Sequence, residues 1–334
     1  MGEGKVRLGV VGLGWWGGVL ADGVAAGDNA EVVSAFARTP ETRQKFADER
    51  GVRQTSSYEE MLADDEIEGV LLATSHLSHA EMIEQAADAG KHVFVEKPFT
   101  LSVESGKQAI AASEKAGIVL QVGHNKRRQQ ANRRIKEMID GGDLGTVVLV
   151  ETHQNVPVGL KMNPQYWRAS RDESPLGSMT GLGVHMFDTM NYLLGPVESL
   201  FTFSRSGVVP DTVPIDHVTS IVLQFASGAQ GYLGTSFMTS PTVSVTVRGT
   251  GGTVWNEQDG AAFFKQQAEG MGRDAVDVDH NDTIADQLTE FANAVRGGPA
   301  PETGGAEGLE VISMLAAAVA SAESGKAVSV ADFR

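Results

Sequence analysis

The stretch Lys5–Gly17, KVRLGVVGLGWWG, decides the fold of this chain. Its first seven residues form the short, mostly apolar run of a strand, and Gly12, Gly14 and Gly17 follow with the spacing G-x-G-x-x-G. The first glycine permits a tight turn, the second lets the backbone approach a pyrophosphate, and the third lets a helix pack closely on the strand. N–H groups at the start of that helix would hold the diphosphate. The stretch therefore predicts dinucleotide binding, and the alternative is a tight turn that binds nothing.

The composition of the 334-residue chain leaves room for two domains and narrows the classes of function. The 27 basic and 43 acidic residues give a net charge of −16, so neither a nucleic acid nor an anionic membrane is an expected partner. The chain has no cysteine, which excludes disulfides, thiol nucleophiles and cysteine-ligated zinc. No signal peptide and no apolar run near the ~18 residues of a membrane span is evident, so we expect a cytoplasmic protein.

Strands and helices alternate over the first part of the chain. Strands are expected at Ala30–Ala37, Glu68–Thr74, His92–Val95 and Ile118–Val122. The helices between them have start signals, namely Thr39 before Pro40, the capping boxes Ser57/Glu60 and Ser78/Glu81, and Ser102. This alternation is typical of a doubly wound parallel sheet, so residues 1–123 are predicted to form an N-terminal Rossmann domain of α/β class.

The pattern changes after residue 123. The predicted helices are Lys126–Asp140, Gly183–Leu194, Thr283–Arg296 and Ala306–Ser324, and the predicted strands are Thr146–Gln154, Ser199–Ser206, Val218–Phe225, Gln230–Ser236, Val243–Gly249 and Thr253–Glu257. Turn residues between the alternating strands indicate an antiparallel meander. Residues 124–334 are therefore predicted to form a C-terminal α+β domain with an open, mainly antiparallel sheet. Such a sheet needs a cover, and we expect a homodimer or homotetramer.

The tip of the second expected strand bears on the choice of cofactor. An NAD-specific site usually places Asp or Glu there, about 20 residues past the glycine motif, to bind the ribose 2′-hydroxyl. Here the tip reads Ala37-Arg38-Thr39, without a carboxylate. A guanidinium beside a hydroxyl suits a 2′-phosphate, so the sequence favours NADP over NAD. An ordinary solvated arginine is the alternative.

A second chemical signal follows the strand His92–Val95. The tripeptide Glu96-Lys97-Pro98 comes at the carboxyl edge, where ligands of open α/β sheets bind. Pro98 disfavours a helical Lys97 and holds it extended. Its ammonium can then bond a substrate hydroxyl or help to remove its proton as hydride leaves. A surface lysine at a strand end is the alternative.

Further motifs run in order over essentially the whole chain. They are GLGWWG (12–17), ATSHLSH (73–79), AGKHVFVEKPF (89–99), VGHNKRR (122–128), YWR (166–168), GLGVHMFD (181–188) and SAESGKAVSV (321–330). Together they resemble the glucose–fructose oxidoreductase/inositol dehydrogenase family (Gfo/Idh/MocA), and AGKHVFVEKP is the most specific block. The resemblance implies a two-domain NAD(P)-dependent oxidoreductase that acts on sugars, polyols and related hydroxy compounds.

The resemblance assigns two catalytic residues. Lys97 corresponds to the lysine of the active site, and His185 corresponds to the general acid/base, a role that suits neutral imidazole. Many members have an aspartate four residues before this histidine, where the present chain has Gly181. Asp188 can reach the ring if one helix includes both residues, and Thr180 is a weaker substitute.

The remaining candidates divide between cofactor and substrate. The cofactor candidates are Gly12, Gly14, Trp15, Trp16, Gly17, Arg38, Thr39, Thr74, Ser75, His79, Glu96 and Lys97, and the substrate candidates are Asn125, Tyr166, Trp167, Arg168 and Asp188. By the resemblance, Trp167 can stack on a sugar face and Arg168 can pair with a phosphate or carboxylate. The two tryptophans can instead pack between the domains, and His79 can simply begin a helix.

The first hypothesis is an NAD(P)-dependent dehydrogenase or reductase that interconverts a secondary alcohol and a ketone on a sugar, inositol or similar polyol. No metal is expected, because no third ligand joins His76 with His79 or His185 with Asp188. One alternative is a redox-neutral, NAD-dependent glycosidase of the same family, which the missing aspartate makes more plausible. A non-catalytic nucleotide-sensing protein is the other, and the presence of both Lys97 and His185 speaks against it.

Overall fold

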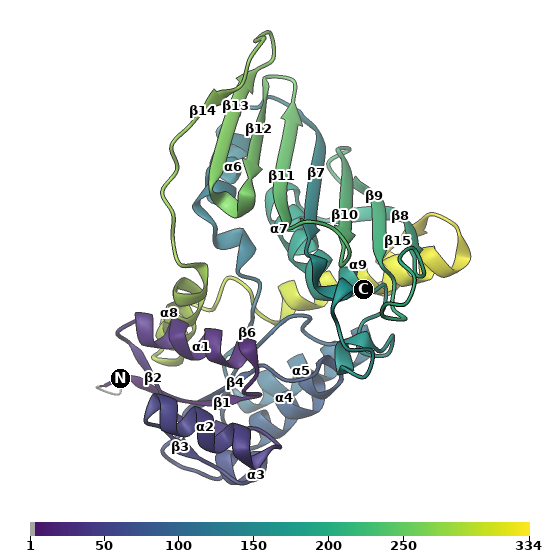
Figure 1. Ribbon diagram of the computed structural model, residues 1–334. Coiled ribbons are helices and arrows are strands. Elements are labelled where there is room, and N and C mark those ends of the chain that lie inside the picture. The colour runs from purple at the N-terminus through teal and green to yellow at the C-terminus, as the bar shows by residue number, and fades with distance from the viewer. Residues whose placement is uncertain (1–3) are drawn as a thin grey trace. The chain divides into compact units, whose positions relative to one another are not determined.

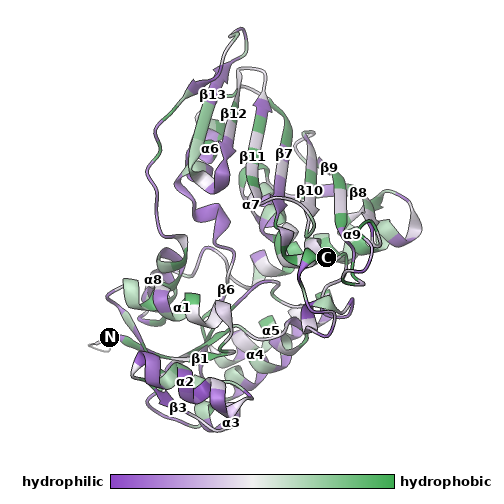
Figure 2. Ribbon diagram, in the orientation of Figure 1, coloured by the Kyte–Doolittle hydropathy of each residue, from purple (hydrophilic) through white to green (hydrophobic). Residues whose placement is uncertain are grey.

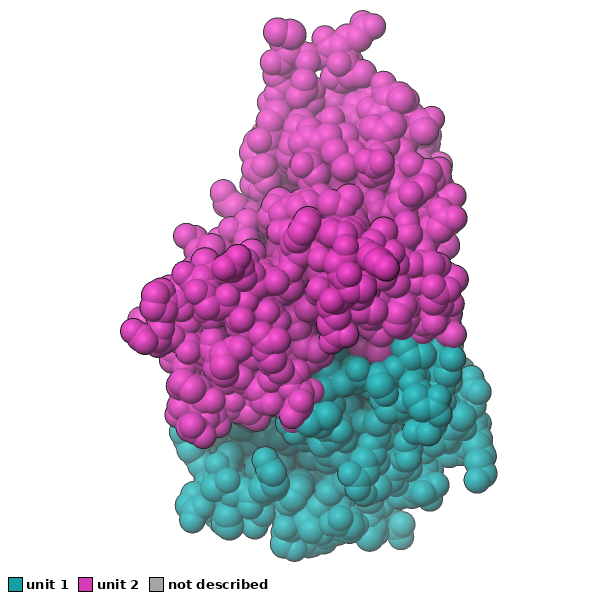
Figure 3. All heavy atoms as spheres, turned by 90° about the vertical axis from the view of Figure 1, so that its right-hand side faces the viewer, with its two compact units in different colours: residues 1–125, 282–309 teal, residues 126–281, 310–334 magenta. Residues whose placement is uncertain are grey.

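The computed structural model describes residues 4–334, which divide into two compact units (Figure 1). The first unit contains the chain up to residue 125 together with residues 282–309, and the second contains residues 126–281 and 310–334 (Figure 3). The chain thus enters the second unit close to the expected boundary. It then returns, so the second unit is not the continuous stretch 124–334 that we expected.

The first unit is built on a six-stranded parallel sheet with the order β3-β2-β1-β4-β5-β6. Its strands are β1 Val6–Val11, β2 Ala30–Phe36, β3 Arg53–Gln54, β4 Gly69–Leu72, β5 His92–Val95 and β6 Leu120–Val122. Its helices are α1 Trp15–Ala26, α2 Pro40–Arg50, α3 Tyr58–Leu62, α4 His79–Asp88, α5 Val103–Ala116 and α8 Thr283–Val295. Helix α1 packs with α8 and α4 packs with α5, and right-handed crossovers place these two pairs on opposite faces. The predicted doubly wound parallel sheet is confirmed.

The predicted helix starts are only partly confirmed. Ser57 and Ser102 accept the backbone N–H groups of Glu60 and Ser105 at 3.0 and 3.1 Å, as N-caps should. Ser78 occupies the N-cap position of α4, but its side chain makes no capping bond, because its hydroxyl donates back to the carbonyl of Ser75 across the 3-10 turn η1, His76–Ser78. The side chain of Thr39 makes no capping bond at the start of α2 either.

Helix α8 returns to the first unit because its apolar face completes that core. Leu288 and Phe291 are buried in the same cluster as Val6 and Leu8 of β1. On α1, a Cβ at Gly23 would meet the side chains of Ile284 and Leu288 at 2.7 and 2.9 Å, so only glycine allows the two helices this close. The side-chain amide of Gln121 on β6 also donates to a carbonyl of α8.

The second unit contains a nine-stranded sheet with the order β14-β13-β12-β11-β7-β10-β9-β8-β15. Its strands are β7 Val147–Asn155, β8 Val197–Arg205, β9 Val218–Phe225, β10 Gln230–Ser236, β11 Thr242–Gly249, β12 Gly252–Glu257, β13 Ala262–Gln267, β14 Asp274–Ala275 and β15 Val328–Ser329. All neighbouring pairs are antiparallel except β7 with β10. This confirms the predicted mainly antiparallel sheet, although β13, β14 and β15 were not predicted.

One face of this sheet is covered and the other is open within the chain. Helices α6, Gln130–Asp140, and α7, Val184–Leu194, pack on β12 and β7. Both hydrophobic and hydrophilic residues occur along the strands of this sheet in Figure 2, and buried residues recur at every second position of β9. On β9, Ile221 and Leu223 are buried whereas Val222 between them is exposed, and Phe203 on β8 is 70% exposed.

Helix α9, Gly305–Ser324, is the one helix in residues 4–334 that is long and apolar enough to cross a membrane. Half of the most apolar stretch of α9 is buried inside the structure, and Val311, Leu315 and Ala318 are among its core residues. The helix therefore packs as a core helix does. The expectation that no apolar stretch approaches this length does not hold for α9.

Candidate active site

The glycine turn between β1 and α1 has the geometry that a dinucleotide requires. Gly12 has φ +90°, and a Cβ there would lie 2.4 Å from the carbonyl oxygen of Ala73. A Cβ at Gly17 would lie 2.2 Å from the carbonyl oxygen of Gly12. Gly14 is the N-cap of α1 without a side-chain cap, and a Cβ there would meet no atom within 4 Å. The turn thus leaves space beside the positive end of α1, and these residues fit a pyrophosphate.

A cavity of about 600 Å³ opens beside this turn, between α1 and α2. It is lined by Leu13, Gly14, Trp15, Gly18, Val19, Asp22, Thr42, Lys45, Phe46, Glu49 and Arg50. Arg50 pairs with Asp22 at 2.6 Å and lies over the Phe46 ring, so its charge is already compensated within the cavity. The arginine supports the wall of the cavity and does not add an unpaired cation to it.

The end of β2 presents Arg38 and Thr39 at the surface. Both residues are exposed, and within residues 4–334 neither side chain makes a hydrogen bond or an ion pair. Arg43 of α2 shapes this tip, because its Nη1 donates to the carbonyl of Ala37 at 2.8 Å and its guanidinium lies over the Phe36 ring. Arg43 therefore fixes the backbone at the end of β2, while the side chains of Arg38 and Thr39 stay accessible to solvent.

Lys97 lies just past the end of β5 and is only 7% exposed. Its Nζ is 5.3 Å from the centroid of the Trp16 ring, which stands in the first turn of α1 beside the glycine motif. The Lys97–Pro98 peptide bond is cis. Glu96 is buried, with its Oε1 3.2 Å from where a Cβ of Gly123 would stand. The structure thus brings the lysine and the glycine turn together, as expected for residues at the carboxyl edge of one sheet.

His79 was expected against the cofactor, but it is 0% exposed. Its Nδ1 is 2.9 Å from the carbonyl oxygen of Pro98, so it supports the segment that carries Lys97. This burial argues against a contact between His79 and the cofactor, because a bound molecule cannot touch a fully buried ring. Thr74 and Ser75 are half-buried, and Oγ of Ser78 lies 2.9 Å from Oγ1 of Thr74 and 2.7 Å from the carbonyl oxygen of Ser75.

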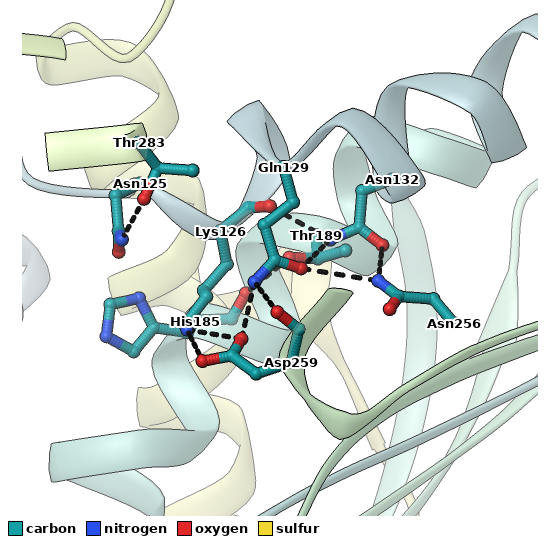
Figure 4. A network of polar contacts seen from close by, with 9 residues as sticks. All are labelled: Asn125, Lys126, Gln129, Asn132, His185, Thr189, Asn256, Asp259 and Thr283. Carbon is teal, nitrogen blue, oxygen red and sulfur yellow. Dashed lines mark hydrogen bonds and ion pairs between the residues drawn. The ribbon is translucent and has the colours of Figure 1, made fainter. Parts of the chain in front are cut away.

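Asn125, a substrate candidate, is a buried residue that ties two segments of the first unit together. Its Nδ2 donates to Oγ1 of Thr283 at 2.8 Å (Figure 4). The bond joins the segment after β6 to the first residue of α8. The substrate role of Asn125 stays a prediction.

In the second unit, His185 stands in the first turn of α7. It is buried, and its carbonyl accepts the hydroxyl of Thr189 at 2.9 Å (Figure 4). A π-helix, η5 Met179–Gly183, leads directly into α7 and was not anticipated from the sequence. Within it, a Cβ at Gly181 would lie 3.0 Å from Cζ of Phe237. The ring of Phe237 therefore occupies part of the space that a larger residue at position 181 would need.

Asp188 forms a buried ion pair that the sequence did not predict. Its two carboxylate oxygens accept Nε and Nη2 of Arg127, at 2.9 and 2.6 Å. Asp188 is 0% exposed and Arg127 is buried. The carboxylate is thus engaged as half of a buried ion pair with Arg127, and the substrate role of Asp188 stays a prediction. Sequence reasoning missed the pair because the two residues are far apart in the chain.

A polar network that sequence reasoning also missed fixes the turn η6, Gln258–Gly260, to the start of the second unit (Figure 4). Nζ of Lys126 donates to Oδ2 of Asp259 at 2.7 Å, and the Gln129 amide donates to the same carboxylate. Asp259 itself has φ +57°. Asn132 and Asn256 extend the network, with Nδ2 of Asn256 2.9 Å from Oδ1 of Asn132. The Asp-Gly step at 259–260 was the available signal for a tight turn here.

Tyr166, Trp167 and Arg168 form a stack on the second unit. The two aromatic rings have centroids 5.5 Å apart, and the guanidinium of Arg168 lies 4.6 Å from the Trp167 centroid. The next residue, Ala169, is buried in one apolar cluster with Phe237, against which Leu182 of the π-helix also packs. The stack is therefore anchored next to the helix that carries His185. Residues 4–334 contain no group of three or more His, Asp or Glu side chains that could hold a metal ion.

Comparisons with known proteins agree with both units. Residues 6–124 match the family described as "Oxidoreductase family, NAD-binding Rossmann fold" and residues 136–330 match its "C-terminal alpha/beta domain". The chain is 26% identical to the 1,5-anhydro-D-fructose reductase of Ensifer adhaerens, over 97% of this chain and 98% of that protein. It is also 26% identical to the myo-inositol 2-dehydrogenase of Thermotoga maritima, with the same coverage. A crystal structure from Desulfitobacterium hafniense superposes with a TM-score of 0.94 at 29% identity, over 99% of both chains.

Proposed function

The chain belongs to the Gfo/Idh/MocA family of NAD(P)-dependent oxidoreductases, and from that premise we propose that it interconverts a secondary alcohol and a ketone on a sugar, inositol or related polyol. The observation that carries the proposal is the buried Lys97, whose ammonium stands beside the glycine turn at the carboxyl edge of the parallel sheet. A cationic donor at this place can bond the reacting oxygen of a small hydroxy compound. The relatives named above act on compounds of this kind.

Two side chains share the proton chemistry in this proposal. A bound nicotinamide cofactor would supply the hydride chemistry of this reaction, and the glycine turn Gly12–Gly17 would hold its pyrophosphate. Lys97 donates a hydrogen bond to the carbinol oxygen and stabilises the negative charge that develops on it. His185 takes the proton of the carbinol O–H in oxidation and returns it in reduction. Its place on a helix anchored by Asp188 and Arg127 supports this role, because the pair limits the freedom of α7.

We further propose NADP as the preferred cofactor. Arg38 and Thr39 are exposed at the tip of β2, and no carboxylate of that tip is available for a ribose 2′-hydroxyl. Arg43 holds the tip through the carbonyl of Ala37. A guanidinium presented in this way suits a 2′-phosphate dianion. Titration with NADPH and NADH in turn, followed by quenching of tryptophan fluorescence, tests the preference. Tighter binding of NADH would contradict it.

The stack of Tyr166, Trp167 and Arg168 is our candidate substrate platform. Aromatic faces pack against the C–H face of a sugar, and a guanidinium held over one of them can bond hydroxyl or carboxylate oxygens. Tyr166 is exposed, so a ligand can reach the stack from solvent. Asn125 and Asp188 remain weaker substrate candidates, because each already has a buried partner.

The open face of the nine-stranded sheet supports a homodimer or homotetramer. Phe203, Val218 and Val222 on β8 and β9 expose apolar surface that a second copy can cover. The net charge of −16 leaves nucleic acids and anionic membranes outside the proposal. A cytoplasmic location stays a prediction.

A redox-neutral glycosidase is the second candidate function. Gly181 beside Phe237 favours it, because the helix turn before His185 carries no acid or base at this position. Incubation with cofactor and a panel of sugars, polyols and glycosides separates the two activities. A dehydrogenase accumulates reduced cofactor with a matched hydroxy substrate, whereas a glycosidase releases aglycone without net reduction. Absence of nucleotide binding in the folded protein would exclude both activities.

A further inference from the structure

The ammonium of Lys97 lies over an aromatic ring of the glycine motif itself. Its Nζ is 5.3 Å from the Trp16 centroid, within the range of a cation–π contact. Trp16 is half-buried, whereas Trp15, one residue earlier, is 74% exposed. The two indoles meet edge to face at 4.8 Å, so Trp15 packs against Trp16 from the solvent side. The motif that forms the phosphate turn therefore also supplies a wall for the lysine.

The burial of Lys97 makes the contact with Trp16 important for the charge of its ammonium. Lys97 is 7% exposed, and an ammonium taken out of water is unstable unless its surroundings supply negative potential. Trp16 stands in the first turn of α1, whose N-terminal end carries positive potential and so disfavours a nearby cation. The negative face of an indole acts in the opposite direction, and tryptophan provides the strongest such face.

The backbone of Lys97 is anchored separately from its ammonium. The ring of His79 is 2.9 Å from the carbonyl of Pro98, and this bond holds the segment after β5. A change at Trp16 therefore acts on the charged end of the side chain while the main chain keeps its own support.

We propose that Trp16 is a positioning residue that keeps Lys97 charged and aimed at the glycine turn. The proposal rests on the proposed function for its meaning in catalysis, since a charged Lys97 is the hydrogen-bond donor of that reaction. The pair itself can be tested without substrate or cofactor. Lysine reacts with acylating reagents only as the neutral amine, so any group that stabilises the ammonium slows acylation.

The experiment measures acylation of Lys97 in the folded, ligand-free protein by acetic anhydride at several pH values between 7 and 10, with peptide mass spectrometry. Exposed Lys107 in α5 serves as the internal reference. Trp16→Leu removes the ring face, Trp16→Phe keeps a weaker one, and Trp15→Leu is the matched control one residue away. If Trp16→Leu does not fold by circular dichroism, Trp16→Met takes its place.

We expect Lys97 in Trp16→Leu to react about five to ten times faster, relative to Lys107, than in the parent protein. Trp16→Phe should fall between the two, and Trp15→Leu should match the parent. Equal Lys97 reactivity in the parent and in both Leu and Phe variants would overturn the proposal. So would an equal acceleration in Trp15→Leu, which would mean that simple exposure is responsible.

A second readout connects the pair to catalysis. Once a substrate is known, the alkaline limb of the kcat/KM profile should move to lower pH in Trp16→Leu and be largely restored in Trp16→Phe. An unmoved limb would contradict the catalytic part of the proposal. The acylation result does not depend on the kinetic result. A protein that lacks dehydrogenase activity but shows slow Lys97 acylation would refute the proposed function. The proposed Trp16–Lys97 contact would still hold.

Discussion

Arg127 and Asp188 form a bidentate, buried ion pair that joins the start of the second unit to helix α7. Nε and Nη2 of the guanidinium donate to Oδ2 and Oδ1 at 2.9 and 2.6 Å. The arginine also lies over the Tyr192 ring of the same helix, 5.3 Å from its centroid. Because His185 stands one turn before Asp188, the pair holds the helix that carries the proposed general base.

Asp188→Ala should destabilise the protein strongly, because it leaves the Arg127 guanidinium buried without its carboxylate. Removing one partner of a buried pair typically costs about 3–5 kcal/mol. Urea denaturation followed by circular dichroism measures the change. The matched control is Glu137→Ala, which breaks the exposed Arg134–Glu137 pair and should cost less than about 0.5 kcal/mol. Equal losses in the two variants would mean that the Arg127–Asp188 pair is not buried in solution.

His185→Ala should lower turnover with the natural substrate by about a hundredfold to ten-thousandfold, since a positioned general base contributes on that order. Cofactor affinity should stay within about twofold of the parent, because the proposed nucleotide site lies in the first unit. Steady-state kinetics and fluorescence titration provide the two measurements. His280→Ala, a substitution at an exposed histidine, is the control. Undiminished turnover in His185→Ala would remove the catalytic assignment.

Arg38→Ala should weaken NADPH binding by about tenfold to a hundredfold and leave NADH binding nearly unchanged, because a charge-assisted bond to the 2′-phosphate is lost. Titration calorimetry with each nucleotide measures both affinities. Lys45→Ala on α2 removes an exposed positive charge from the same region and controls for the general field. If both nucleotides weaken equally in Arg38→Ala, the arginine does not discriminate between them.

Arg296→Gln should lower the free energy of unfolding at neutral pH and lower it less at acidic pH. Arg296 bonds both carboxylate oxygens of Glu68, and this contact, with the backbone N–H of Arg7, holds the pKa of Glu68 below its usual value of 4.5. A depressed carboxyl pKa stabilises the fold above the unfolded-state value, and this stability is lost as pH falls through the folded-state value. The Arg296–Glu68 pair is partly exposed, so the free energy of unfolding should fall by about 1 kcal/mol at pH 7.

Urea midpoints of the parent and Arg296→Gln at pH 7 and pH 3 check this dependence on pH. The difference in urea midpoint between the two proteins should shrink at pH 3, because the stabilisation that comes from a depressed carboxyl pKa is lost as pH falls toward the folded-state value. Arg205→Gln, at an exposed arginine at the end of β8, is the control for loss of an arginine that has no carboxylate partner within residues 4–334. A constant difference at both pH values would show that charge pairing is not the cause.

Phe203→Asp should dissociate the proposed homo-oligomer, because it places a charge in the middle of the exposed apolar surface on β8 and β9. Sedimentation velocity measures the mass of the parent and variant. Met271→Asp, at a fully exposed residue between β13 and β14, is the control and should leave the mass unchanged. A monomeric parent protein would contradict the oligomer directly.

Local patterns predicted most of the elements in the first unit and fewer in the second. Ser57 and Ser102 were identifiable as caps, because a cap depends only on residues within one turn. The same reasoning failed at Ser78, whose hydroxyl has nearer acceptors in the preceding turn. Strand β13, Ala262–Gln267, was missed because its sequence AFFKQQ places two aromatic residues side by side and does not alternate cleanly. The π-helix before α7 has no sequence signal that we can identify.

The sequence by itself determined the glycine turn, the parallel sheet and the lysine at the end of β5. These features depend on neighbouring residues: a turn with φ +90° at Gly12 excludes side chains, and a strand followed by Glu96-Lys97-Pro98 places the lysine at a sheet edge. Only the tertiary structure decided that His79 is buried, that α8 returns to the first core and that Asp188 binds Arg127. The last two residues are 61 positions apart, so their contact follows from how the helices pack and not from any spacing in the chain.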